Sequence, residues 1–177
     1  MKLGVSTLLA TLALASFEAN SALKAPHVVA ALTAPGGETL LLRAFADGVQ
    51  VYECGRGESG LQWVLKGPEA NLVDDRSQSI GKHYAGPTWE SIDGSRVVGS
   101  VVASVDASDP TAIPHLLLKA KERAGEGVFA NVRSIQRLQT AGGRAPKEMC
   151  LVKDIGRVVR IHYSATYYFY GDKANTL

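Results

Sequence analysis

The greatest density of chemically useful side chains lies in the run Gly81-Lys-His-Tyr-Ala-Gly-Pro-Thr-Trp-Glu90. A histidine and a carboxylate in one stretch could do general acid–base work, so His83 with Glu90 or Tyr84 is a candidate centre of a hydrolase or lyase. The other chemical interpretation is a stacking surface for a flat or sugar-like ligand, with the candidates His83, Tyr84, Trp89 and Trp63. A structural alternative is a loop whose rings cover the core. Because no nucleophile stands in a recognisable setting, we expect a binding module and keep catalysis as the alternative.

Neither metal ligation nor anion binding follows from spacing alone. The four histidines, which are His27, His83, His115 and His162, contain no i, i+2 or i, i+4 pair, so we expect no metal site unless the fold gathers them. Arg133, Arg137 and Arg160 could form a basic stripe for an anion if their strands pair. A solvated strand face is the alternative for these arginines.

One literal motif favours a nucleotide cofactor. Gly55, Gly57 and Gly60 form G-x-G-x-x-G directly after the strand-like residues 49–54. In dinucleotide-binding domains the last glycine opens a helix whose amides hold the pyrophosphate. Here residues 61–65 are a short apolar run that Gly67-Pro68 soon ends, whereas a crossover connection needs about a dozen residues. The sequence therefore predicts a glycine-rich β-hairpin. We expect no cofactor, and a dehydrogenase is disfavoured.

The start of the chain predicts export. Met1-Lys2 and an uncharged run over residues 3–15 resemble a secretory signal peptide, so we expect residues 1–22 to be removed and residues 23–177 to form one β-rich domain. The protein would then be secreted or periplasmic. A net charge of +2 offers no strong field for nucleic acid, and no second long apolar run suggests a transmembrane segment. We expect a small molecule, a glycan or an envelope protein as the partner, and leave the oligomeric state open.

The two cysteines, Cys54 and Cys150, fit the same compartment. In an exported chain an even pair most simply forms a disulfide. A pair of buried free thiols is the alternative. Their separation rules out a C-x-x-C redox or zinc motif.

The distribution of apolar residues predicts strands. The clearest is 157–170, where one face would carry Val159, Ile161, Tyr163, Ala165, Tyr167 and Phe169. Further strand-like runs are 28–32, 39–45, 49–54, 61–65, 96–105 and 128–138, the last with Arg137 on its polar face. Turn dipeptides such as Asp47-Gly48 and Asp93-Gly94 separate several of them.

Two regions are less regular. Residues 67–88 look like a long loop, which compact domains usually keep for function. Pro114 predicts irregular chain, followed by a strand or a short helix from His115. Short strands without helices between them favour an all-β fold, mainly an antiparallel β-sandwich or barrel, with at most one or two short helices.

Several longer motifs resemble a known family. They are Gly48-Val-Gln-Val-Tyr-Glu-Cys54, Gly67-Pro68-x-Ala70, Gly81-x-His83 to Glu90, Ile135 to Cys150 and Tyr163 to Tyr170. Together they resemble domain-of-unknown-function family 3455, whose members are exported bacterial proteins and fungal relatives without an established activity. Some fungal members carry the label malate dehydrogenase, which would imply a dinucleotide domain that the residues after Gly60 do not provide. The sequence departs from the family pattern at His115, where the pattern has a tryptophan.

Overall fold

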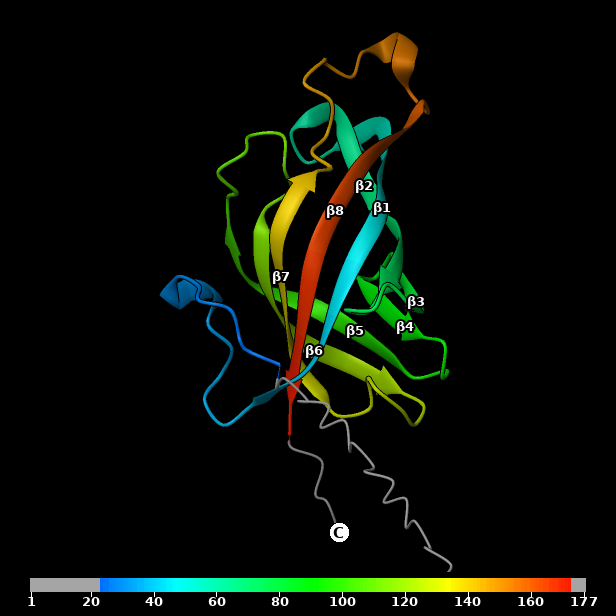
Figure 1. Ribbon diagram of the computed structural model, residues 1–177. Helices are drawn as coiled ribbons and strands as arrows, with labels where there is room; N and C mark the ends of the chain where they lie inside the picture. Colours follow the sequence, from blue (N-terminus) through cyan, green and yellow to red (C-terminus); the bar gives the residue numbers. More distant parts are fainter. Residues whose placement is uncertain (1–22, 173–177) are drawn as a thin grey trace, which may run out of the picture.

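Residues 23–172, which this computed structural model describes, fold into eight β-strands and two short 3-10 helices. Each strand pairs in antiparallel fashion with the next, and β8 returns to pair with β1, so the sheet closes into a barrel (Figure 1). The elements are η1 (Ala30–Leu32), β1 (Thr39–Gly57), β2 (Gly60–Val73), β3 (Ser79–Tyr84), β4 (Thr88–Ser91), β5 (Arg96–Val105), β6 (His115–Ala124), β7 (Val132–Gly142), η2 (Val152–Asp154) and β8 (Val158–Gly171). The predicted all-β, mainly antiparallel fold is confirmed, and of the two expected architectures it is the barrel.

The alternating residues of β8 supply much of the barrel interior. Tyr163, Ala165, Tyr167 and Phe169 are all buried and belong to one core cluster. Side chains two residues apart point to the same face of a strand, so this face points inward throughout. The predicted burial of this face is confirmed over residues 163–169.

Strands β1 and β2 contribute mainly small side chains to the same core, including Ala44, Ala46 and Ala70. The large rings come from elsewhere, with Trp89 on β4 and the aromatic residues on β8. Small residues on two strands leave room for the rings of the others, as a narrow barrel requires.

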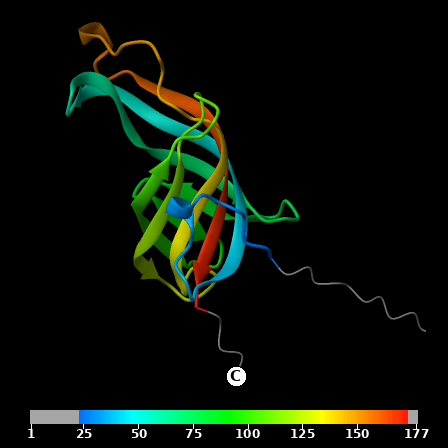
Figure 2. The ribbon, with the colours of Figure 1, turned by 90° about the vertical axis from the view of Figure 1, so that its left-hand side faces the viewer.

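The N-terminal segment covers part of the outer surface. Leu32 in η1 is buried against Leu117, Leu138, Tyr168 and Tyr170, which point outward from β6, β7 and β8. Figure 2 shows this segment, in blue, lying across β7 and β8. Gln136 Nε2 donates a hydrogen bond to the Leu32 carbonyl at 2.6 Å and fixes the segment to the barrel.

The glycine motif lies in a hairpin, as predicted. Gly55 and Gly57 end β1, Gly60 begins β2, and no helix follows them. Beside this hairpin, Cys54 is joined to Cys150 by the predicted disulfide, which ties the segment before β8 to β1. Figure 1 shows that segment, in orange, next to the projecting ends of β1, β2 and β8. In the described residues no helix has the length and hydrophobicity to cross a membrane.

Several predicted local features are wrong. Residues 28–32 form no strand, and their last three residues are the 3-10 helix η1. Asp47-Gly48 is not a turn, because β1 continues through it while pairing with β2 and β8 on its two sides. A Cβ on Gly48 would lie 2.2 Å from the Glu69 carbonyl, so the glycine permits close strand contact there rather than a turn.

The predicted long loop at 67–88 is also wrong. It contains the end of β2, all of β3 and the start of β4. Barrel closure supplies pairing partners on both sides and outweighs weak local strand preference. By contrast β7 begins only at Val132, since residues 128–131 form a turn. Of the strand and the short helix that were both expected from His115, the structure has the strand, β6.

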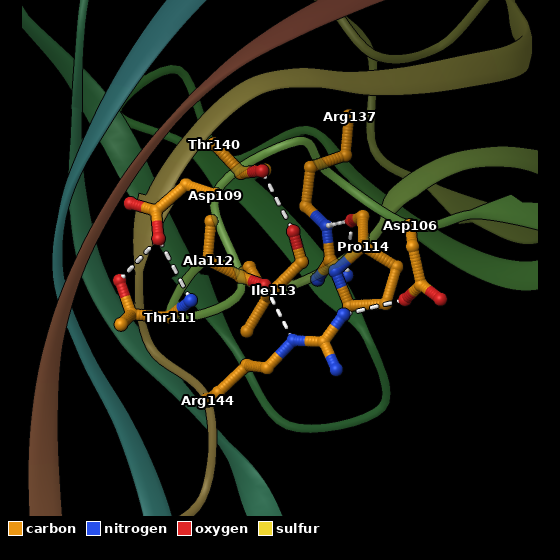
Figure 3. Close-up of polar contacts among 9 residues, drawn as sticks. All are labelled: Asp106, Asp109, Thr111, Ala112, Ile113, Pro114, Arg137, Thr140 and Arg144. Atoms are coloured by element: carbon orange, nitrogen blue, oxygen red, sulfur yellow. Dashed lines mark hydrogen bonds and ion pairs between the residues drawn. The ribbon is translucent and has the colours of Figure 1, made fainter.

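The two ends of the barrel are closed differently. At one end Phe129, in the connection between β6 and β7, is fully buried and lies 4.9 Å from the Phe169 ring. At the other end, residues 106–114 connect β5 to β6; of these only Ala112 and Ile113 are buried, and side chains on and after β7 hold the loop (Figure 3). Thr140 donates to the Ile113 carbonyl at 2.6 Å, and Arg144 Nε donates to the Ala112 carbonyl at 2.7 Å.

Candidate functional site

A cavity of about 310 Å³ lies within the barrel wall and reaches its interior. Its deeply buried polar and aromatic lining residues come from four strands and are Gln50, His83, Trp89 and Tyr167. Leu65 and Val101, which also line it, are 52% and 55% exposed, so the cavity opens to solvent beside them. Its volume is at the lower end of the usual range for small-molecule sites.

The cavity is built around stacked rings. His83 on β3 and Trp89 on β4 are cross-strand partners, and their ring centroids lie 4.4 Å apart at 10°. Tyr167 from β8 meets both rings edge-on, at 5.0 Å and 5.3 Å. Three strands thus hold one rigid aromatic wall, and each ring limits the rotation of the others.

His83 is neutral in this position. Its Nδ1 lies 2.8 Å from the Thr88 carbonyl, which can only accept, so Nδ1 carries the proton and donates. Burial lowers the pKa of His83 to about 3, although the bond to Thr88 opposes the shift. Nε2 therefore has a free lone pair at neutral pH and can accept a hydrogen bond, but it is a very weak base.

Four buried polar atoms lack a hydrogen-bond partner in the described residues. They are Gln50 Nε2, Trp89 Nε1, Tyr163 Oη and Tyr167 Oη. Three of these side chains line the cavity, while Tyr163 is four residues from Tyr167 on the same face of β8. A buried polar group without a partner costs about 1–3 kcal/mol, so this concentration opposes folding unless something else uses the groups.

Arg137 on β7 brings a positive charge to the cavity. Its Nε and Nη2 donate to the Pro114 carbonyl at 3.1 Å and 2.9 Å (Figure 3), and no carboxylate in the described residues pairs with it. The three arginines do not form the basic stripe that their pairing could have given: Arg133 pairs with Asp172 and Arg160 with Glu69 on the exposed surface, as in the solvated-face alternative. The polar face predicted for Arg137 is likewise corrected: the residue is half-buried and lines the cavity.

Residues 35–171, which include all eight strands and every residue that lines the cavity, match the family model described as "Protein of unknown function (DUF3455)". The chain belongs to the DUF3455 family. The resemblance noted from its motifs is thereby confirmed. Neither the curated proteins nor the solved structures contain a match.

In this DUF3455 chain the candidate acid–base residues do not meet. His83 points into the barrel, whereas Tyr84 and Glu90 lie outside, where the Tyr84 hydroxyl donates to Glu90 Oε2 at 2.5 Å. That hydrogen bond raises the pKa of Tyr84. Neighbouring positions on a strand face opposite sides, so the sheet separates His83 from both partners.

The candidate stacking residues are split as well. His83 and Trp89 share the cavity, but Trp63 lies on the projecting hairpin, where its Nε1 donates to the Glu148 carbonyl at 2.9 Å. Trp63 borders a larger hollow of about 950 Å³ that also touches Tyr52 and Ile161. No unpaired buried polar atom belongs to a residue that lines that hollow. The smaller cavity is therefore the stronger candidate site.

Sequence reasoning missed Gln50 as a site residue, and it considered Arg137 only as part of an anion-binding stripe with Arg133 and Arg160. The alternation of β8 indicated that Tyr163 and Tyr167 face inward, but it could not show that their hydroxyls lack partners. Gln50 gave no signal, because it lies between valines in a strand-like run. Within residues 23–172, no three His, Cys, Asp or Glu side chains gather to hold a metal ion.

Proposed function

We propose that this DUF3455 chain is a binding module that holds a small molecule in the cavity beside His83 and Trp89. The observation that carries the proposal is the group of unpaired polar atoms on Gln50, Trp89 and Tyr167, which line one cavity of suitable size. A ligand that bonded to these atoms would offset the cost of burying them. The expected binding role of the 67–90 region is thus kept for His83 and Trp89, and Gln50 and Tyr167 are added.

The size of the cavity favours a small molecule over a glycan chain. A volume of about 310 Å³ is near the lower limit of about 300 Å³ for pockets that bind small molecules. Several sugar units would need more space or an open groove. The cavity walls also include Pro68, Pro87 and Leu118, which suit an apolar body.

The proposed place of action is outside the cytoplasm, with residues 23–177 acting as one exported domain. The Cys54–Cys150 disulfide is compatible with an extracellular location. The expected signal peptide, residues 1–22, lies outside the described residues.

A hydrolase or lyase centred on His83 has less support. Its expected partner Glu90 lies on the other face of the sheet, and a histidine with a pKa of about 3 is a poor general base at neutral pH. The same neutral ring is well suited to accept a hydrogen bond from a ligand.

A blocked cavity tests the binding proposal. Val101 lines this cavity, whereas its neighbour Val102 lines a different hollow, and the two side chains are 55% and 61% exposed. Small molecules that raise the melting temperature of the protein should lose that effect in Val101→Trp and keep it in the matched control Val102→Trp. If a broad small-molecule panel at millimolar concentration gives no stabilisation of the unaltered protein, or if Val101→Trp leaves the stabilisation intact, the proposal fails.

A further inference from the structure

The charges around the cavity have one sign. Among the described residues that line it, Lys66 and Arg137 are cationic, and there is no aspartate or glutamate. Lys66 is exposed and its Nζ lies 3.2 Å from Glu53 Oε2, so its charge is balanced. Arg137 is half-buried and bonds to a carbonyl, which carries no formal charge. An unbalanced guanidinium is thus the principal charge of this site.

The position of Arg137 is fixed by the fold. Two of its nitrogens donate hydrogen bonds to the Pro114 carbonyl. Arg144 binds the same loop, because it donates to the Ala112 carbonyl and pairs with Asp106 at 2.5 Å. Figure 3 shows that Asp106 of this loop pairs with Arg144 rather than with Arg137, while Asp109 bonds to Thr111. The remaining guanidinium nitrogen, Nη1, makes no hydrogen bond within the described residues. Arg137 therefore retains donor capacity and charge for another partner.

The unpaired groups of the cavity have the matching polarity. The Trp89 indole N–H can only donate, and the Tyr167 hydroxyl can donate. Burial raises the pKa of Tyr167, while the nearby charge of Arg137 and the neighbouring side chains of Tyr163 and Arg137 oppose that rise, so the hydroxyl keeps its proton beside the guanidinium. The Gln50 amide can turn to present its NH₂ group. The site therefore offers donors and a cation to an incoming group, and His83 Nε2 as one acceptor.

We propose that the ligand of this cavity is a small organic carboxylate, whose anionic group is held by Arg137 and the donors of Tyr167 and Trp89. This inference rests on the proposed function and specifies its ligand class. Guanidinium and carboxylate groups match in shape and charge, and charge-assisted hydrogen bonds are about twice as strong as neutral ones. The proline and leucine walls accept a compact apolar or aromatic body. A ligand hydroxyl would complete the site by donating to His83 Nε2.

Matched acids and amides test the charge requirement directly. The probes are benzoate and hexanoate against benzamide and hexanamide, titrated at pH 7 and followed by the indole N–H signals in NMR spectra. The chain has two tryptophans, and Trp63→Phe assigns the signal of Trp89 by removing the other one. At least one acid should shift the Trp89 signal saturably, and its amide should bind on the order of tenfold more weakly or not at all.

Variants on one strand test the role of Arg137. Arg137→Gln should weaken binding of the acid on the order of tenfold, and Arg137→Lys should retain part of the affinity because the charge remains. Arg133→Gln on the same strand points outward and should leave the affinity unchanged. The comparison of acids with amides uses the unaltered protein, so it stands even if a variant at Arg137 folds poorly.

The outcomes separate this inference from the proposed function. Equal binding of acids and amides, or acid binding that survives in a folded Arg137→Gln variant, overturns the carboxylate assignment while ligand binding stands. No response to either acid at millimolar concentration also overturns the assignment. The Val101→Trp and Val102→Trp variants test independently whether a ligand binds in the cavity. A crystal structure with ordered water on Trp89 and Tyr167 after soaking in both acids would overturn it as well.

Discussion

The hydroxyl of Tyr167 is fully buried and has no hydrogen-bond partner in the described residues, unlike the hydroxyl of Tyr52, which donates to the Gly143 carbonyl at 2.8 Å. Replacing tyrosine with phenylalanine removes the hydroxyl and keeps the ring. We expect Tyr167→Phe to leave the free energy of unfolding unchanged or to raise it by about 1 kcal/mol, whereas Tyr52→Phe should lower it by about 1–2 kcal/mol. Urea denaturation of the ligand-free proteins measures both.

Comparison of these two variants separates what the Tyr167 hydroxyl contributes to ligand binding from what it contributes to stability. Any acid that stabilises the protein through Tyr167 should do so less in Tyr167→Phe, even though that variant is no less stable. A group whose removal improves stability but weakens binding is retained for function. If Tyr167→Phe destabilises the protein as much as Tyr52→Phe does, the hydroxyl has a structural partner and the assignment of the site is undermined.

Among the elements, the turn between β4 and β5 holds the segment that carries Phe129, the buried side chain that plugs one end of the barrel. Asp93 accepts hydrogen bonds from Ser95 N at 2.8 Å, Ser95 Oγ at 2.6 Å and Val128 N at 2.9 Å, and Ser95 Oγ in turn accepts from Phe129 N. Asp93→Ala should cost about 1–3 kcal/mol and increase hydrogen exchange at Phe129, because the plug loses its anchor. Asp109→Ala is the control, since Asp109 bonds only to Thr111, two residues away.

The hydrogen bonds of Asp93 also predict that the stability of the protein depends on pH. The hydrogen bonds from the Ser95 side chain, Val128 and the Ser95 backbone lower the pKa of Asp93 from 3.8 to about 2. As the pH falls, Asp93 takes up its proton at a higher pH in the unfolded chain than in the folded protein. The stabilisation from its hydrogen bonds is therefore complete above about pH 4 and is lost as the pH falls toward 2. Because Asp93 is exposed, the loss is modest. A stability profile between pH 5 and 2 should therefore be flatter in Asp93→Asn; an equally steep profile would contradict the anchor.

The elements also show what the sequence could and could not predict. Strict alternation predicted the buried face of β8, and the glycine spacing with a short apolar run predicted the β1–β2 hairpin. Local signals failed at 67–88, where β3 and β4 are short and become strands through their neighbours. The polar face predicted for Arg137 is wrong because the predicted strand begins at residue 128. In the structure β7 begins at Val132, and its pairing with β8 shifts register between Val132 and Ser134. Register irregularities depend on partners that the local sequence does not contain.

In the whole molecule, the Cys54–Cys150 disulfide links β1 to the segment between β7 and β8. The bond closes a loop with a sequence separation of 96, and its loss should lower stability by at most about 4–5 kcal/mol in the chain-entropy model. The segment between β7 and β8 also carries Arg144, which holds the loop whose Pro114 carbonyl accepts hydrogen bonds from Arg137. The double variant Cys54→Ser/Cys150→Ser should therefore unfold at a lower temperature, and hydrogen exchange should increase at 106–114 more than at the Phe129 plug. Alkylation of the native protein without reduction should leave both cysteines unmodified, whereas two alkylated thiols would contradict both the bond and this coupling.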